Sequence, residues 1–276
     1  VQAGALATLT ISPQNPTMAA GAQQSFAAQG ADSCGNALTV SPSWSVIAGG
    51  GSIDAAGLFT AGSAAGSYTN TIEARSGSVA ATTSVTITAG SIAKVEITPT
   101  SATVEVGKSV SFSAKAFDAG GNPVSAVFAW SASNGSIDTN GSFKAGDVAG
   151  TFTDSVMATA DGVTGKASVT ITAGPVASVV VTPATITIAP GGQSTFTAKV
   201  TDSHGNPRND TVTWAVSPQA AGSIDSSGNF TAGSAVGVYA DAVTASVGSV
   251  SGKASVTIAA DALHHLELTP KTVTLS

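Results

Sequence analysis

The sequence predicts an all-β protein built from tandem β-sandwich domains, and three observations support this prediction. The chain of 276 residues repeats itself about every 85 residues. Within each repeat, apolar and polar residues alternate over short runs, as they do in half-buried strands. No segment has a helical periodicity of useful length.

The repeat is marked by a tripeptide, a tryptophan and a phenylalanine. The tripeptide Ile11-Ser12-Pro13 returns with its proline at positions 99, 183 and 270, so successive prolines lie 86, 84 and 87 residues apart. Single aromatic residues recur with the same spacing: Trp44, Trp130 and Trp214, and Phe26, Phe112 and Phe196. A period of about 85 residues exceeds that of a solenoid or propeller and matches an autonomous small sandwich domain.

The second repeat shows the expected strands most clearly. Alternating apolar residues predict strands at 95–97, 104–106, 112–116 and 127–130, a hairpin at 137–143, and closing strands at 152–158 and 167–171. About seven short strands with a turn roughly every ten residues are typical of an immunoglobulin-like sandwich. We therefore expect tandem immunoglobulin-like β-sandwich domains arranged as a rod.

The repeat spacing also predicts the domain boundaries. We assign 1–4 to the tail of a preceding repeat, 5–89, 90–173 and 174–260 to three repeats, and 261–276 to the opening strands of a fourth. The parent protein is therefore expected to continue in both directions. Each linker is short and carries one apolar residue, which we expect to be buried at the domain junction and to restrain bending: Leu6, Ile92, Val176 and Leu263.

Two motifs resemble those of bacterial immunoglobulin-like domains. The turn Gly121-Asn122-Pro123-Val124 after Asp118 resembles the invasin/intimin type, and the stretches 51–62, 135–146 and 222–233 resemble group 2 domains. The resemblance covers essentially the whole chain. It implies spacers and adhesin stalks of surface proteins, although such domains also occur in phage tails and beside enzyme modules. In the first repeat Cys34-Gly35-Asn36-Ala37 replaces the Gly-Asn-Pro turn, so we expect that loop to differ.

Composition excludes several classes of function. The net charge is −6 and the ten basic residues are scattered, so nucleic-acid binding is not expected. No apolar run approaches the roughly 18 residues that span a bilayer, so we expect no membrane insertion in this segment. A single cysteine excludes an intrachain disulfide and favours, weakly, an exported protein.

Residues that recur in every repeat are interpreted as structural, because a catalytic constellation would more often be unique. One acidic residue per turn suits a bond to backbone N–H groups, whereas calcium needs six to eight oxygen ligands. We expect no catalytic, cofactor-binding or metal-binding residues. The expected turn residues are Asp32, Asp118, Asp202, Asp54, Asp138 and Asp225, and the expected core residues are the six aromatic residues at the recurring positions, Trp44, Trp130, Trp214, Phe26, Phe112 and Phe196.

Few residues are unique to one repeat. Cys34 occupies the position of Gly120 and His204, and an idle surface thiol is favoured over intermolecular crosslinking or catalysis. His204 and the pair His264-His265 are expected to be solvated, because they lack the spacing of metal ligands. Four sequons in turns are candidate glycosylation sites: Asn134, Asn140, Asn209 and Asn229.

The leading functional hypothesis is a structural segment of a long extracellular or cell-surface filament or stalk, not an enzyme. Its expected partners are neighbouring copies, through strand addition or lateral packing. In its sharper form the chain polymerises, with 266–275 paired to another molecule. The alternatives are an adhesin or carbohydrate-binding module that contacts host-cell or matrix glycans and proteins, and a phage tail or decoration domain.

Overall fold

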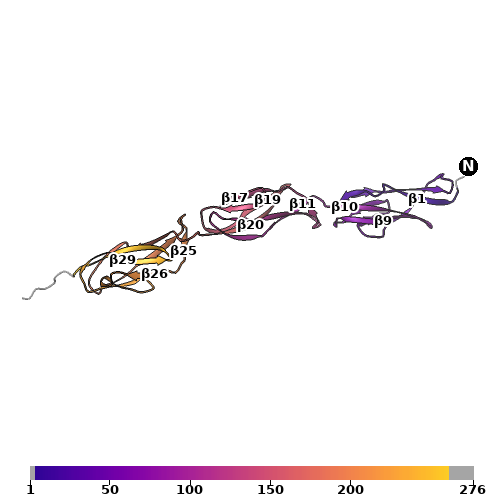
Figure 1. The fold of residues 1–276 in the computed structure, drawn as a ribbon. Coiled ribbons are helices and arrows are strands. Elements are labelled where there is room, and N and C mark those ends of the chain that lie inside the picture. Colours follow the sequence, from indigo (N-terminus) through magenta and orange to yellow (C-terminus); the bar gives the residue numbers. More distant parts are fainter. Residues whose placement is uncertain (1–3, 261–276) are drawn as a thin grey trace, which may run out of the picture. The chain divides into compact units, whose positions relative to one another are not determined.

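The computed structural model describes residues 4–260, and nearly all of its regular structure is β-strand (Figure 1). In this part of the chain the only helical element is a single 3-10 turn, η1 (Gln219–Ala221). The prediction of an all-β protein with tandem immunoglobulin-like β-sandwiches is confirmed. The predictions for His264-His265, Leu263 and 266–275 concern residues outside this described range.

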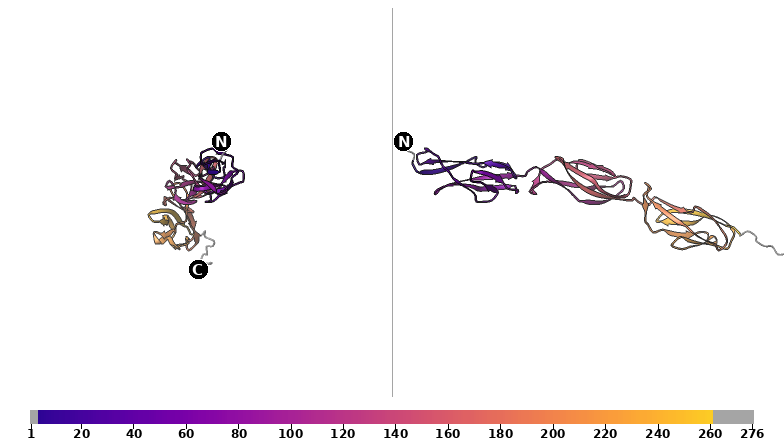
Figure 2. Two further views of the ribbon diagram at one scale, coloured as in Figure 1. Left: turned by 90° about the vertical axis from the view of Figure 1, so that its right-hand side faces the viewer. Right: turned by 180° about the vertical axis from the view of Figure 1, so that it is seen from behind.

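Between residues 4 and 260 thirty strands follow one another in three sets of ten. Figure 2 shows this part of the chain from two further sides. The first set is β1 (Leu6–Ser12), β2 (Thr17–Ala19), β3 (Gln23–Ser25), β4 (Ala27–Asp32), β5 (Ala37–Leu38), β6 (Ser43–Val46), β7 (Gly51–Ile53), β8 (Leu58–Ala61), β9 (Gly66–Ser76) and β10 (Val79–Thr88). The second set is β11 (Ile92–Thr98), β12 (Ser101–Glu105), β13 (Ser109–Ser111), β14 (Ser113–Asp118), β15 (Pro123–Val124), β16 (Ala129–Ala132), β17 (Gly135–Ile137), β18 (Ser142–Ala145), β19 (Gly150–Ala160) and β20 (Val163–Thr172). The third set is β21 (Ser178–Thr182), β22 (Thr185–Ile188), β23 (Gln193–Thr195), β24 (Thr197–Thr201), β25 (Pro207–Arg208), β26 (Thr213–Val216), β27 (Gly222–Ile224), β28 (Asn229–Ala232), β29 (Gly237–Val247) and β30 (Val250–Ile258).

Each set of ten strands forms the same three sheets. In the first set the strand orders are β1-β4-β5, β2-β10-β9-β6 and β3-β8-β7, and the other two sets repeat them as β11-β14-β15, β12-β20-β19-β16 and β13-β18-β17, then β21-β24-β25, β22-β30-β29-β26 and β23-β28-β27. The pairs β2–β10 and β22–β30 are parallel, whereas β9–β10 and β29–β30 are antiparallel hairpins. Strands β1 and β10 belong to different sheets yet contact each other, as β21 and β30 do, which is the contact between layers of a sandwich.

The chain forms two compact units. The first contains the described residues up to Ala102, together with Ser109–Lys144 and Thr151–Thr170. The second contains Thr103–Lys108, Ala145–Gly150 and the described residues from Ile171 onward. The residue-level contacts described below each lie within one of these units.

The structure has more strands than the seven or so expected per repeat, because several strands change sheet. For example, the alternating apolar residues from Val110 to Ala116 do not form one strand, because Phe112 lies between β13 and β14. The backbone N–H of Phe112 donates to the carbonyl oxygen of Gly141 at 2.8 Å instead of joining either ladder. Phe26 and Phe196 make the same bond to Gly57 and Gly228 at 2.8 and 2.9 Å. A single apolar run in the sequence is thus divided between two sheets.

Recurring pairs of phenylalanine rings lie in the core. Phe26, Phe112 and Phe196 are buried, and each meets a second, fully buried phenylalanine edge-on. The pairs are Phe26–Phe59, Phe112–Phe143 and Phe196–Phe230, with ring centroids 6.2, 6.4 and 5.8 Å apart and interplanar angles of 83–84°. Such edge-to-face pairs contribute about 0.5–1.5 kcal/mol beyond the area they bury.

The three tryptophans are only partly buried. Trp44 and Trp214 pack against the buried clusters of their own repeats, with the Trp44 ring 6.4 Å from Phe26. Trp130 has the same intermediate exposure. The indoles therefore cover the edge of the phenylalanine core instead of forming its centre.

Candidate functional site: the repeat junctions

In each repeat one buried aspartate organises the turn that follows β4, β14 or β24. Asp118 is 5% exposed, and its Oδ1 accepts hydrogen bonds from the backbone N–H groups of Gly120 at 2.9 Å and Asn122 at 2.8 Å. Asp202 binds the N–H groups of His204 and Asn206 in the same way, both at 2.9 Å. The turn role expected from one acidic residue per loop therefore agrees with the geometry.

The second oxygen of each aspartate binds the linker that enters the repeat. Gly90 donates its backbone N–H to Oδ2 of Asp118 at 2.8 Å, and Gly174 does so to Asp202 at 2.8 Å. Glycine and aspartate are 28 residues apart in both cases. One carboxylate therefore ties the turn and the linker together.

An asparagine four residues after each aspartate extends this contact to the preceding repeat. Nδ2 of Asn122 donates to Oδ2 of Asp118 at 2.8 Å and to the carbonyl oxygen of Ser63 at 2.6 Å. Its Oδ1 accepts the backbone N–H of Ala65 at 2.9 Å. Ser63 and Ala65 lie in the loop between β8 and β9, which joins two different sheets, and we call this loop the tip of the first repeat. The short amide side chain supplies both the donors and the acceptor that this bridge needs.

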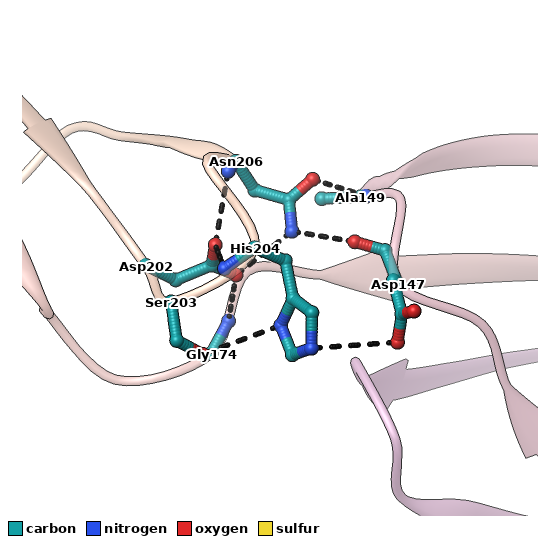
Figure 3. Close-up of polar contacts among 7 residues, drawn as sticks. All are labelled: Asp147, Ala149, Gly174, Asp202, Ser203, His204 and Asn206. Carbon is teal, nitrogen blue, oxygen red and sulfur yellow. Dashed lines mark hydrogen bonds and ion pairs between the residues drawn. The ribbon is translucent and has the colours of Figure 1, made fainter.

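The same bridge joins the second and third repeats (Figure 3). Nδ2 of Asn206 donates to Oδ2 of Asp202 and to the carbonyl oxygen of Asp147, both at 2.8 Å. Its Oδ1 accepts the backbone N–H of Ala149 at 2.8 Å. We call the pairs Asp118–Asn122 and Asp202–Asn206 junction clamps, because each pair bonds its own turn, its linker and the tip of the preceding repeat.

Hydrogen bonds keep the clamp carboxylates ionised. The bond from the Asn122 side chain, then that from Gly90, lowers the pKa of Asp118 from the ordinary 3.8 to about 2. Burial raises the pKa of Asp202, but the bonds from Asn206 and Gly174 outweigh it, and the pKa lies well below the ordinary value. The clamps are therefore charge-assisted at neutral pH.

The first repeat keeps the same aspartate and asparagine, so the expected difference in its loop is wrong. Oδ1 of Asp32 accepts the backbone N–H groups of Cys34 and Asn36, and Oδ2 accepts those of Gly4 and the Asn36 side chain, all at 2.9 Å. Replacement of the proline by Ala37 changes none of these bonds, because the carboxylate makes them with backbone N–H groups and the asparagine amide. The pKa of Asp32 is likewise lowered to about 2, chiefly by Asn36.

The two junctions differ at the position that Cys34 occupies in the first repeat. A Cβ at Gly120 would collide with the carbonyl oxygen of Ser63, so this junction has no room for a side chain. The third repeat has His204, whose Nε2 lies 3.4 Å from Oδ1 of Asp147 (Figure 3). His204 is exposed to solvent, as expected, with 39% of its side chain exposed, and it also contacts the preceding repeat.

Arg208 reinforces the second junction further. Its guanidinium binds both oxygens of Asp210, at 2.6 and 3.0 Å, and donates to the carbonyl oxygens of Gly174 and Ala173 in the linker. The corresponding residue of the second repeat is Val124, which has no side-chain donor. The junction before the third repeat therefore has more linker contacts.

Other residues singled out in the sequence lie apart from the clamps. Asp54, Asp138 and Asp225 each accept two backbone N–H bonds in a hairpin turn, at 2.8–2.9 Å. Cys34 is exposed. The candidate glycosylation residues Asn134, Asn140, Asn209 and Asn229 are all exposed. Leu6, Ile92 and Val176 are partly buried, and Val176 packs against the core of the third repeat.

Residues 4–260 contain no group of three or more His, Cys, Asp or Glu side chains placed to hold a metal ion. This part of the chain also contains no helix long and apolar enough to cross a membrane.

The asparagine and the linker glycine are the functional residues that the sequence did not single out. A signal was present, because a glycine, an aspartate 28 residues later and an asparagine four residues after that recur together in all three repeats. Within one loop, however, the aspartate indicates only a turn.

The comparisons with known proteins concern the fold. No family model matches the chain, and no curated protein sequence matches it. Among solved structures, the Escherichia coli adhesin FdeC is 21% identical, with 94% of this chain and 100% of that chain covered and a TM-score of 0.45. Domains 1–6 of the surface layer protein SbsC are 15% identical, with 95% and 41% covered and a TM-score of 0.39. Protocadherin gammaB7 EC3-6 is 14% identical, with 91% and 73% covered and a TM-score of 0.40.

The class of protein is defined by the fold: the chain is a tandem array of immunoglobulin-like β-sandwiches. The structures it resembles are of an adhesin, a surface layer protein and a protocadherin, all surface proteins with tandem domains. The narrower resemblance to group 2 bacterial domains stays a prediction.

Proposed function

We propose that this chain is a non-catalytic structural segment of an extracellular filament or stalk. The observation that carries this proposal is the junction clamp, which occurs at both described junctions. If the repeats made no contact with one another, polar side chains at the junctions would face water. Here the recurring asparagines, Asn122 and Asn206, connect neighbouring repeats.

The clamp restrains the linker through specific contacts. Between β10 and β11 the linker is only 89–91, and the Gly90 N–H is bound to a carboxylate. Each junction gains two bonds from the asparagine amide, and each bond contributes about 0.5–1.5 kcal/mol. A restrained junction transmits force and orientation from one repeat to the next, as a stalk or filament requires.

A glycan-binding role is the alternative in the binding-module class. Sugars bind to exposed aromatic faces, but Trp44 and Trp214 pack against the cores of their own repeats. The adhesin and surface layer structures that this chain resembles are compatible with either a structural or a glycan-binding role. We therefore rank the structural role first.

Two measurements test the proposal. Antibodies raised against the chain should label intact cells that produce the protein, and labelling only after lysis would contradict an extracellular role. Nuclear relaxation should show that the Asn122→Ala, Asn206→Ala double variant lets the repeats tumble more independently than the wild type does. The Asn36→Ala variant is the matched control and should leave tumbling unchanged; equal tumbling in all three proteins would exclude restraint by the clamp.

A further inference from the structure

The two described junctions share the asparagine bridge but differ in the side chains around it. Pro175 in the second linker corresponds to Ser91 in the first, and Arg208 corresponds to Val124. Residues that can restrain the second junction therefore have less restrictive counterparts at the first. Because the two repeats have the same strand order, this difference comes from the side chains and not from the fold.

The linker of the second junction is longer but more restrained. It comprises 173–177 between β20 and β21, against 89–91 at the first junction. The ring of Pro175 fixes one backbone dihedral angle and restricts the residue before it. The guanidinium of Arg208 donates to two carbonyl oxygens of this linker. The serine and valine at these two positions of the second repeat supply neither restraint.

A side-chain contact gives the second junction a further point of attachment. Nε2 of His204 lies 3.4 Å from Oδ1 of Asp147 in the preceding tip (Figure 3). A linker and an asparagine bridge alone attach two repeats at two points, and rotation about the axis between those points stays possible. The His204 contact opposes this rotation. Gly120, which occupies the same position at the first junction, has no side chain that could do so.

The first junction also has unfilled space beside its linker. A hollow of about 440 Å³ lies between Ala20 and Ser63 of the first repeat and the linker and turn of the second repeat. At the second junction Val106 takes the place of Ala20, is 8% exposed and lies against Gly174. Space on one side of the first linker allows the two repeats to bend toward it without a collision.

We propose that the first junction is a hinge and that the second junction is rigid. Bending is concentrated at 89–91, and the Asn122 bridge limits the bend and acts as its pivot. A hinge of this kind needs only a few residues whose backbone dihedral angles can change. The inference rests on the proposed structural function and adds where the segment bends under a sideways load.

Residual dipolar couplings of the wild-type chain in a dilute aligning medium test the hinge. They give the strength of alignment of each repeat separately, and motion of one repeat relative to its neighbour weakens its alignment. We expect the third repeat to align as strongly as the second, and the first repeat to align more weakly. A first repeat that aligns as strongly as the third, or more strongly, would overturn the proposal.

A variant gives the second junction the side chains of the first. Pro175→Ser, His204→Gly and Arg208→Val together introduce the residues that the second repeat carries at these positions, so the third repeat should still fold. We expect the alignment of the third repeat to fall relative to that of the second. Unchanged alignment of the third repeat would contradict a restraint by these side chains and overturn the proposal.

Lys199→Val is the matched control. Lys199 is exposed on β24 of the same repeat, and its replacement removes one positive charge, as Arg208→Val does. This variant should leave the relative alignment of the repeats unchanged, and an equal loss of alignment in it would assign the effect to charge and not to the junction. None of these results bears on surface labelling of intact cells, so failure of the hinge is distinguishable from failure of the structural role.

Discussion

Replacing Asn206 by alanine should destabilise the third repeat more than replacing Asn36 destabilises the first. Both variants lose the bond between the asparagine amide and its aspartate, Asp202 or Asp32. Only Asn206→Ala also loses the two bonds to the preceding repeat, each 2.8 Å long. The difference between the variants therefore isolates the contribution of the junction.

The magnitude follows from these two bonds. A neutral hydrogen bond contributes about 0.5–1.5 kcal/mol net, so Asn206→Ala should cost about 1–3 kcal/mol more than Asn36→Ala. For a small domain, a loss of about 2 kcal/mol lowers the urea midpoint by about 1–2 M.

Each repeat has one tryptophan, which allows its unfolding to be followed separately. Trp44→Phe and Trp130→Phe together leave Trp214 as the reporter for the third repeat, and the corresponding double replacement leaves Trp44 for the first. Each asparagine variant is compared with its parent in the same background. Equal losses of stability in the two repeats would refute the reasoning, because the bonds to the preceding tip would then contribute nothing.

Three further predictions concern the core, the clamp carboxylates and a turn. Phe143→Ala should cost about 3–5 kcal/mol in urea unfolding, and Trp130→Ala should cost less because the indole is only partly buried; the opposite order would mean that the indole forms the core. The lowered pKa of Asp118 stabilises the fold above pH 3.8, and this contribution should be lost as the pH falls through about 2. Asp118→Asn should therefore reduce the loss of folding stability at acidic pH in a profile of stability against pH. An unchanged loss of stability at acidic pH would exclude this role. Gly141→Ala should cost at least about 1–3 kcal/mol in thermal unfolding, because Gly141 has φ +80° and an added Cβ would collide with the Phe112 carbonyl oxygen; an unchanged melting temperature would contradict this steric account.

Much of the fold could be predicted because its signals are local and recur. Val85 and Ile87 alternate with polar residues along β10 and are nearly fully buried, as period-two patterning requires. The change of sheet at Phe112 could not be predicted in this way. An apolar run has the same periodicity whether it stays in one ladder or crosses to another.

The junction clamp was only half predictable for a similar reason. The sequence predicts Asp118 to be a turn residue, because a turn is a contact over a few residues. Its bond to Gly90 spans 28 residues, and the Asn122 bonds to the first tip span 57 and 59. Such contacts depend on how consecutive repeats meet, which neither propensity nor spacing within one repeat describes.

Amide hydrogen exchange in the wild-type chain tests the clamp most directly. The N–H groups of Ala65 and Ala149 occupy the same position in the tips of successive repeats and are bound by Asn122 and Asn206. The N–H of Val236 occupies that position in the third tip, which is exposed. We predict slow exchange at Ala65 and Ala149 and fast exchange at Val236. Equally fast exchange at all three amides would show that the clamps do not hold in solution.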